Sequence, residues 1–344
     1  MTELRSPSER PELATGRVLA RRYRLVRKLG AGGMGEVWSA EHVTLQARVA
    51  VKVLHAHALA VPAVVARFRR EALLLGRMHS NHLPRAIDFL EDDVHGPVLV
   101  TELVEGVSLA DLLAQPLSIE QAIELGIDLA TGIAELHRAS VVHRDLKPGN
   151  VILRPVGPGR TRAVIIDLGV SRLVGQDFPG EVAETTGNDV VVGTVAYMAP
   201  EQILGCGDVT PVADLYALGA LLFRAVTGRH VFGADLDRLE LVRAKLTRKA
   251  PSLPTARRDP VARGLAAVVA RALERHPARR FQSAEELRAD LLHLLDVASA
   301  RAAHAGRAKV SRTPSEEPTT GTPSAFSAVR ELVWSMRRRV ATPR

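Results

Sequence analysis

One stretch of this chain decides which fold and chemistry we expect, His143-Arg144-Asp145-Leu146-Lys147-Pro148-Gly149-Asn150. Transfer of a phosphoryl group requires an acid that accepts a hydroxyl proton, an oxygen ligand for magnesium and a cation beside the migrating phosphate. Asp145, Asn150 and Lys147 offer these kinds of group within one short loop. The stretch therefore indicates a catalytic loop, provided that other parts of the chain supply a site for a phosphate donor.

A glycine-rich segment near the N-terminus is a candidate for that site. Glycine lets the backbone approach phosphate groups without a side chain in the way. Residues 23–29 before the segment and residues 36–40 after it alternate between apolar and polar types, as strands do. In isolation such a segment is as often a tight hairpin, and a dinucleotide fingerprint would open a helix instead. The strand–loop–strand pattern favours a phosphate-covering loop, which is made of Gly30, Ala31, Gly32, Gly33, Met34, Gly35 and Val37.

A lysine lies inside the apolar strand-like run Val49-Ala50-Val51-Lys52. Its charge is costly there unless it is paired. Glu71, within an amphipathic run at 67–75, is the candidate partner, although an arbitrary glutamate is more often on a solvated helix face. The spacing favours an ion pair that orients Lys52 toward the α- and β-phosphates of a nucleotide.

Lysine is rare in this chain. Of 46 basic residues only six are lysine, at positions 28, 52, 147, 245, 249 and 309. Lys52 and Lys147 stand where a compact ammonium on a thin stem is needed, and a planar guanidinium does not replace it. The segment Ala163-Val164-Ile165-Ile166-Asp167 adds a buried-strand run that ends in an acid, and Asp167 is the second expected magnesium ligand beside Asn150.

Taken together and in this order, these segments resemble the eukaryotic-type Ser/Thr protein kinases, most closely their bacterial branch. The resemblance covers roughly residues 23–295. It implies an α+β, bilobal protein-kinase fold, in which a small antiparallel β lobe of five strands plus one key helix lies over a mainly helical large lobe. We expect a lead-in at 1–22, a kinase domain at 23–298 and a basic tail at 299–344. Within the domain the small lobe takes 23–104 and the large lobe 105–298.

The resemblance also assigns residues around the nucleotide. ATP and Mg²⁺ are the implied cofactors, with Mn²⁺ as an alternative metal. Thr101 falls at the gatekeeper position, and Ala50, Glu102 and Val104 fall beside adenine. Leu168 stands where the family has phenylalanine, a departure that concerns inactive states more than the chemistry.

Further family positions concern the large lobe. By resemblance, Asp214 holds the backbone of the catalytic loop, and Arg280 pairs with Glu201 to fix the end of the activation segment. Lys147 and Thr194 take the form found in Ser/Thr kinases rather than in tyrosine kinases.

Regulation by phosphorylation is a further implication. Arg144 precedes Asp145, and in the family an arginine at this position commonly binds a phosphate group. Thr185 and Thr186 lie shortly before Gly193, where bacterial relatives carry autophosphorylated threonines. The alternative is that both threonines are ordinary loop residues.

Local signals predict some boundaries within the large lobe. Two capping boxes, Ser118 with Gln121 and Ser283 with Glu286, predict helix starts, the second for the last helix of the lobe. The Gly/Pro-rich residues 154–163 predict a hairpin tip.

The tail differs in composition from the rest. Its net charge is +6, from nine Arg/Lys and three Glu in residues 301–344, whereas the whole chain carries +8. Residues 311–325 are rich in Ser, Thr and Pro, and the apolar positions at 326–340 recur at helical spacing beside three arginines. This candidate amphipathic helix could contact a membrane surface weakly, although one that frays or packs back on the domain is more frequent. We expect the tail to be dispensable for catalysis.

The amino-acid composition limits which partners and which cellular location we expect. Because the positive charge belongs mostly to the tail, it does not indicate nucleic-acid binding. The single Cys206 excludes a disulfide framework, and neither a signal peptide nor a transmembrane segment is evident, so the sequence favours a cytoplasmic protein. The expected partners are ATP and protein substrates in bacterial signalling, and a transient homodimer is compatible with the sequence.

Two other functions share parts of this pattern. An inactive nucleotide-binding scaffold would usually have lost residues of the Lys52, Asp145 or Asp167 type, and this chain keeps all three. A small-molecule phosphotransferase of the aminoglycoside type would lack the peptide platform of Ala199-Pro200-Glu201. The sequence therefore favours an ATP-dependent Ser/Thr protein kinase.

Overall fold

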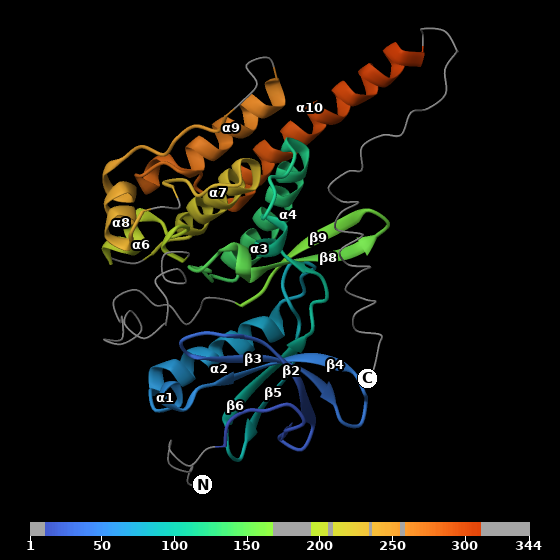
Figure 1. Cartoon of the computed structure of the whole chain (residues 1–344), viewed down its shortest axis with the longest axis vertical. Coiled ribbons are helices and arrows are strands. Elements are labelled where there is room, and N and C mark those ends of the chain that lie inside the picture. The colour runs from blue at the N-terminus through green and yellow to red at the C-terminus, as the bar shows by residue number, and fades with distance from the viewer. Residues whose placement is uncertain (1–10, 168–193, 206–208, 234–235, 255–258, 311–344) are drawn as a thin grey trace.

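The computed structural model describes residues 11–167, 194–205, 209–233, 236–254 and 259–310. One lobe contains an antiparallel sheet and helix α2, and the other contains most of the helices (Figure 1). The predicted bilobal α+β fold is confirmed. Among the described residues, no helix is long and apolar enough to cross a lipid bilayer.

The small lobe is built on a six-stranded antiparallel sheet in the order β1-β2-β3-β4-β6-β5. Its strands are β1 (Val18–Leu19), β2 (Tyr23–Ala31), β3 (Gly35–His42), β4 (Arg48–Leu54), β5 (Ala86–Asp92) and β6 (Gly96–Glu102). Val49, Val51 and Val53 of β4 are buried in the core of the sheet. Because side chains alternate along a strand, Ala50 and Lys52 lie on the opposite face.

Strand β1 is a sixth strand of the small-lobe sheet. The resemblance implied five strands and a lead-in through residue 22, and within that lead-in Val18 and Leu19 pair with Arg24 and Tyr23. Leu19 is fully buried, and the backbone N–H of Ala20 donates to Asp92 Oδ2 at 2.7 Å. The turn into β2 has positive φ at two residues other than glycine, and the strand is only two residues long. Neither feature leaves a signal in the sequence.

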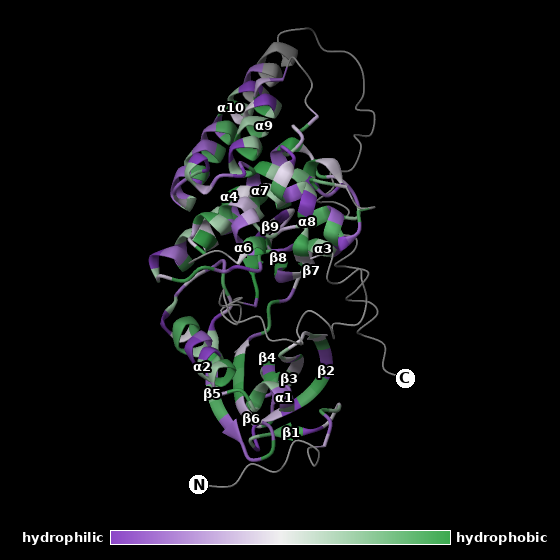
Figure 2. Cartoon of the chain, turned by 90° about the vertical axis from the view of Figure 1, so that its left-hand side faces the viewer, coloured by the Kyte–Doolittle hydropathy of each residue, from purple (hydrophilic) through white to green (hydrophobic). Residues whose placement is uncertain are grey.

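Helix α2 (Pro62–Arg77) follows the short helix α1 (Ala56–Leu59) and carries Glu71. Pro62 at its first position suits a helix start, because the missing N–H has no partner within the helix in any case. Val64, Phe68, Ala72 and Leu75 form a buried stripe, and Glu71 is buried within it. Figure 2 shows hydrophobic and hydrophilic positions along α2, as expected for a helix with one buried face.

The large lobe contains a small sheet and a group of helices. The sheet is formed by β7 (Val107–Ser108), β8 (Val151–Gly157) and β9 (Arg160–Ile165). The helices are α3 (Leu109–Leu112), α4 (Ile119–Arg138), α6 (Pro200–Leu204), α7 (Val212–Thr227), α8 (Arg238–Thr247), α9 (Pro260–Ala272) and α10 (Ala284–Val310), with 3-10 turns at Pro148–Asn150 and Pro277–Arg279. Most of α7 is buried, so this helix forms the centre of the lobe.

The first capping box is confirmed, and the second is only half formed. Ser118 Oγ accepts from Gln121 N at 3.2 Å, and Gln121 Oε1 accepts from Ser118 N at 2.9 Å. Ser283 Oγ accepts from Glu286 N at 3.1 Å, but the Glu286 carboxylate accepts from Gln282 N instead of Ser283 N. Both helices nevertheless begin directly after the predicted serine.

The predicted hairpin tip at 154–163 was too wide. Strand pairing continues through Pro155 with Thr161 and Gly157 with Arg160, so the turn is much shorter. Gly159 has a φ of +68°, which glycine adopts without a steric cost. Gly and Pro marked the turn correctly, but they also occur within the paired residues.

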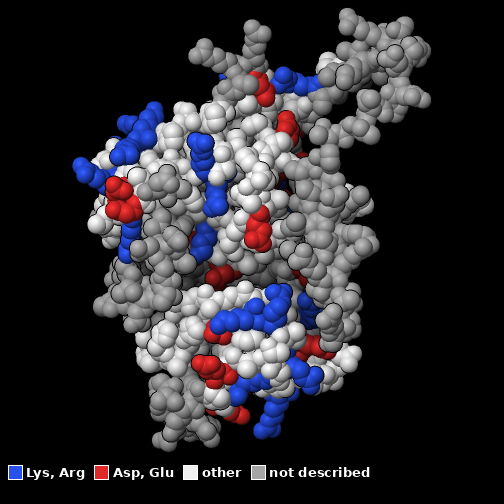
Figure 3. Space-filling model, in the orientation of Figure 1, with Lys and Arg blue, Asp and Glu red and all other residues white. Residues whose placement is uncertain are grey.

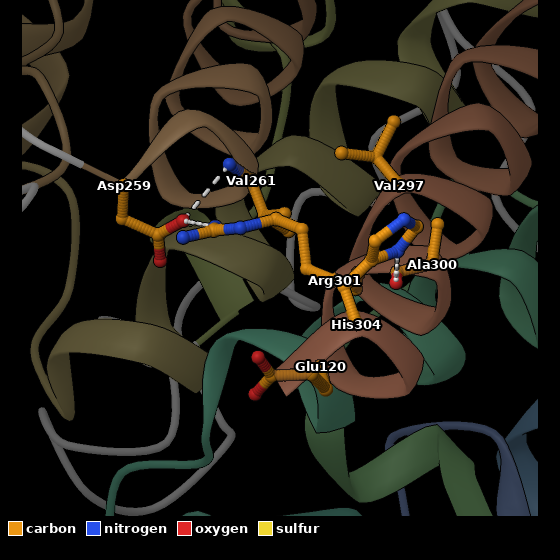
Figure 4. A pocket seen from close by; sticks show the side chains of 8 residues that line it. Glu120, Asp259, Val261, Val297, Ala300, Arg301 and His304 are labelled. Atoms are coloured by element: carbon orange, nitrogen blue, oxygen red, sulfur yellow. Dashed lines mark hydrogen bonds and ion pairs between the residues drawn. The ribbon is translucent and has the colours of Figure 1, made fainter. Parts of the chain in front are cut away.

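Helix α10 continues past the expected domain end at 298 to Val310. Alanine and arginine, which dominate residues 299–310, are strong helix formers. Arg301 also pairs with Asp259 at 2.7 Å, next to the start of α9. A pocket of about 850 Å³ lies here, and Figure 4 shows Val297, Arg301 and His304 of α10 lining it together with Glu120.

Candidate active site

The glycine-rich segment spans the end of β2, the turn at 32–34 and the start of β3, which is the predicted strand–loop–strand pattern. At Gly35 an added Cβ would lie 2.2 Å from the carbonyl oxygen of Val53, so this position requires glycine for packing. At Gly30 and Gly32 an added Cβ would have no heavy atom within 4 Å. These two glycines therefore face open space, as a loop that covers a ligand requires.

Lys52 lies between two carboxylates. Its Nζ is 3.0 Å from Glu71 Oε1 and 2.5 Å from Asp167 Oδ1. The contact with Glu71 is the ion pair that the spacing indicated. The contact with Asp167 was not predicted, and it joins β4 of the small lobe to the residues after β9. In the space-filling view, acidic side chains are visible deep between the lobes (Figure 3).

Burial and neighbouring charges shift the pKa values of Lys52, Glu71 and Asp167. Desolvation acts to lower the pKa of Lys52, but the carboxylates of Asp167 and Glu71 outweigh it and raise that pKa. Burial opposes ionisation of Asp167, yet Lys52 lowers its pKa below the ordinary value. Burial raises the pKa of Glu71, against the effect of the Lys52 ammonium. Lys52 is thus held charged between a buried carboxylate, Glu71, and a partly exposed one, Asp167.

The catalytic loop brings its three predicted groups together. Lys147 Nζ is 2.9 Å from Asp145 Oδ2 and 3.3 Å from the hydroxyl oxygen of Thr194. Asn150 Nδ2 donates to the Asp145 carbonyl at 2.8 Å and to its carboxylate at 3.2 Å. One ammonium therefore contacts both the acid and the start of the described part of the activation segment.

Asn150 and Asp167 fit a magnesium ion by their chemistry. The amide nitrogen of Asn150 is used for Asp145, which leaves its amide oxygen as the group for a cation. The backbone N–H of Ile166 donates to the Asn150 carbonyl at 2.8 Å, so the loop and the strand end are adjacent. Amide and carboxylate oxygens are the hard ligands that Mg²⁺ prefers, and phosphate oxygens of a nucleotide usually complete the set.

The buried Asp214 holds the backbone of the catalytic loop. Its carboxylate accepts from His143 N and Arg144 N, both at 2.8 Å, and it lies 2.9 Å from His137 Nε2. Arg144 has a φ of +66°, an unfavourable value for a residue with a side chain. Two backbone hydrogen bonds to one buried carboxylate stabilise this conformation. The His137 contact had no counterpart among the sequence predictions.

Glu201 and Arg280 form a bidentate ion pair. The distances are 2.6 Å from Nη1 to Oε1 and 2.8 Å from Nη2 to Oε2. The Arg280 side chain has no exposed surface and also donates to three backbone carbonyls, those of Val212, Glu274 and Arg275. A planar guanidinium satisfies all of these acceptors at once.

The residues predicted to lie beside adenine are found where β6 leaves the sheet. Ala50 pairs with Thr101 across β4 and β6. The N–H of Glu102 donates to the Arg85 carbonyl at 2.9 Å, and its carboxylate pairs with Arg154 at 2.7 Å. Val104 follows in an irregular, half-buried segment between the lobes. Thr185 and Thr186 lie outside the described residues, as does the segment 311–344.

Comparison with known proteins agrees with this geometry. The model of the protein kinase domain family matches residues 23–292. The chain belongs to the protein kinase family. It is 39% identical to the Serine/threonine-protein kinase pkn2 of Myxococcus xanthus, over 91% of this chain and 37% of that protein. It is 34% identical to PknB of Mycobacterium tuberculosis, over 80% of this chain and 43% of that protein. The chain thus spans less than half the length of these curated relatives.

Solved kinase structures share the fold. The kinase domain of Mycobacterium tuberculosis PknI, as a double mutant, superposes with a TM-score of 0.61 at 27% identity. The alignment covers 83% of this chain and all of that kinase domain. The chain therefore has the fold of a solved bacterial kinase domain. The roles assigned to single side chains from sequence stay predictions.

Two histidines that sequence reasoning missed contact the glycine-rich loop of this kinase domain. His55 Nε2 lies 3.1 Å from the Gly32 carbonyl oxygen, and His57 Nε2 lies 2.8 Å from that of Gly33. The two rings stack with centroids 5.4 Å apart. A carbonyl oxygen only accepts, so both Nε2 atoms must carry a proton. The pair lies directly after β4, and a H-x-H pattern there was the available signal.

We expect the His57 contact to contribute to ATP affinity. His57→Phe keeps a ring for stacking but removes the donor, and should raise the KM for ATP by about fivefold to tenfold, the effect of one hydrogen bond. His57→Gln keeps a donor and should change this KM less. Steady-state kinetics with the exposed His79→Phe as control test this, and an unchanged KM in His57→Phe would contradict it.

Proposed function

We propose that this chain transfers the γ-phosphoryl group of ATP to serine or threonine hydroxyls of proteins, with Mg²⁺, or Mn²⁺ as an alternative, in bacterial signalling. The observation that carries the proposal is the convergence of Lys52 and Asp167 with the Asp145–Asn150 loop. Residues from both lobes meet there, and each has the chemistry that phosphoryl transfer requires.

The reaction would use these groups as follows. Lys52, oriented by Glu71, would bind the α- and β-phosphates, while Asn150 and Asp167 would hold the metal ion, which neutralises phosphate charge when it is bound. Asp145 would accept or orient the hydroxyl proton of the substrate. Lys147, 2.9 Å from Asp145, is placed to stabilise negative charge on the migrating phosphate. Rate acceleration would come mainly from positioning and charge stabilisation.

Thr194 supports the Ser/Thr class of acceptor. Its hydroxyl accepts from Lys147, so the acid and the segment that ends in Ala199-Pro200-Glu201 are linked through one ammonium. Arg224 of α7 and Lys245 of α8 hold Tyr197 and Met198 of this segment, which would support a peptide. A small-molecule phosphotransferase would have no use for such a platform, and the retained Lys52, Asp145 and Asp167 disfavour an inactive scaffold.

One assay separates these functions. The full chain is incubated with radiolabelled ATP, Mg²⁺ and a generic protein substrate, with Asp145→Asn as the inactive control. Label on protein serine or threonine, lost in the control, supports the proposal. ATP binding without transfer would indicate a scaffold, and transfer only to small aminoglycoside-like acceptors would indicate the other phosphotransferase class.

We also propose that the protein phosphorylates its own activation segment at Thr185 or Thr186. A phosphothreonine carries nearly two negative charges, which an arginine such as Arg144 can bind. Mass spectrometry of active protein is expected to find phosphate on one of these threonines, and none in the Asp145→Asn protein. Active protein without phosphate anywhere between Asp167 and Glu201 would contradict this prediction.

A further inference from the structure

Among the lysines that the site described above does not use, Lys245 of α8 is buried. We propose that Lys245 is a positioning residue for the protein substrate, whose ammonium fixes the Met198 carbonyl and so holds residues 194–199 in the conformation that receives a serine or threonine segment. This inference rests on the proposed kinase function.

The contacts of Lys245 are specific. The residue is 1% exposed, and its Nζ donates to the Met198 carbonyl oxygen at 2.7 Å. The same ammonium lies 4.9 Å from the centre of the Tyr216 ring, which gives a cation–π contact. The cation of Arg280 lies 5.0 Å from the same ring. The aromatic ring is thus shared by two buried cations from different parts of the lobe.

Met198 and Thr194 lie at opposite ends of one short segment, and each is contacted by a lysine. Lys147 contacts Thr194 at one end of the short buried segment, and Lys245 contacts Met198 at the other. Between them, Tyr197 is buried and its hydroxyl accepts from Arg224 at 2.7 Å. Lys147 also contacts Asp145, and Lys245 belongs to α8. The segment is therefore fixed between the catalytic loop and the helices of the large lobe.

Stability alone does not account for a lysine at this position. Burial lowers the pKa of Lys245 to about 7, and the nearby Arg280 adds to this effect while Glu201 opposes it. Burying a cation beside another cation is costly, and an apolar side chain of similar volume is often no less stable. The buried cation therefore costs stability, and the group that it contacts is the backbone of residues 194–199.

The shape of the site also favours lysine over arginine. Arg280 already occupies the neighbouring space, where it binds Glu201 and three backbone carbonyls. A second guanidinium is larger, and it would remain charged at every relevant pH. A thin stem with a compact ammonium fits, in a chain in which arginine otherwise predominates.

The linkage between protonation and stability provides an independent readout. The lysine pKa is lower in the folded protein than in the unfolded chain, where it is about 10.4, so the folded protein binds the proton less well. The resulting cost to stability is fully present below pH 7 and declines as the pH rises from 7 to about 10. The other titratable or charged groups around Lys245 are Arg280, Glu201, Tyr216 and His230.

The test compares Lys245→Met with Lys245→Gln in the full chain. Methionine keeps the unbranched stem without a donor, and glutamine keeps a neutral donor. Lys249→Met, at an exposed lysine just after the same helix, is the control. For each protein we would measure the KM for ATP, the KM for a generic protein substrate, ATP hydrolysis without protein substrate, and the unfolding midpoint at pH 6.

Lys245→Met is expected to raise the KM for the protein substrate about tenfold, to leave the KM for ATP within about twofold, and to unfold at the same temperature as the wild type or higher. Lys245→Gln should show a smaller rise, and the control none. An unchanged KM for protein, or a parallel rise in both KM values, would overturn the inference. So would a lower unfolding midpoint in both variants. A wild type that transfers no phosphate to protein would instead refute the proposed function.

Discussion

Asp145→Asn is expected to lower the kcat for protein phosphorylation by about 10²- to 10⁴-fold, the usual contribution of a general base. The substitution is nearly isosteric, and Asp145 contacts Lys147 and Asn150 rather than the glycine-rich loop. ATP affinity should therefore change little. Phosphate transfer is measured with labelled ATP, and ATP binding is measured separately by calorimetry.

Asp111→Asn, at an exposed acid on α3, is the matched control and should behave as the wild type. The contacts of Asp145 also predict that the catalytic loop stays folded in the Asp145→Asn protein. The Asn150 amide donates to the backbone carbonyl at this position, and the substitution leaves that acceptor in place. If Asp145→Asn retained more than a small fraction of the wild-type turnover, the assignment of the base would be wrong.

Much of the site could be read from sequence because phosphoryl transfer restricts residue type and spacing at the same time. Lys52 and Glu71 show this well, since an ammonium in an apolar strand must find an acid, and the next amphipathic run offered one. The pairing of Glu201 with Arg280 came only from family resemblance, because 79 residues separate them and no local pattern links them.

What the sequence did not reveal depends on contacts between distant or weakly patterned segments. The two-residue strand at Val18–Leu19 has no periodicity to detect, and its stability comes from the burial of Leu19. The contact of His137 with Asp214 spans 77 residues, and no local pattern links the two. Lys245 was counted as a rare lysine, but only the fold shows that it reaches Met198.

Lys52→Met is the second substitution with a large expected effect. Without the ammonium, Glu71 and Asp167 lose their common partner, and ATP phosphates lose the cation that orients them. We expect kcat/KM to fall by at least about a hundredfold. Glu71 would then be buried without its partner, which should also destabilise the fold, by up to about 3–5 kcal/mol where the carboxylate stays ionised.

A double substitution separates the two consequences of removing Lys52. Lys52→Met with Glu71→Gln replaces the orphaned charge by an amide of the same size, so much of the lost stability should return in a urea denaturation experiment while kinase activity does not. Lys249→Met, at an exposed lysine just after α8, is the control. Recovery of activity in the double variant would show that Lys52 acts only through folding.

Lys52→Arg tests whether a compact ammonium is needed. The site holds Lys52 Nζ within 3.0 Å of Glu71 and 2.5 Å of Asp167, and the lysine side chain is only 20% exposed. A guanidinium is wider than an ammonium and extends further, so it cannot meet both carboxylates at these distances without displacing α2 or the end of β9. Lys52→Arg should therefore remain folded, because the charge is kept, yet lose most of its activity. A fully active arginine variant would mean that charge alone suffices at this position, and the argument from lysine usage would fail with it.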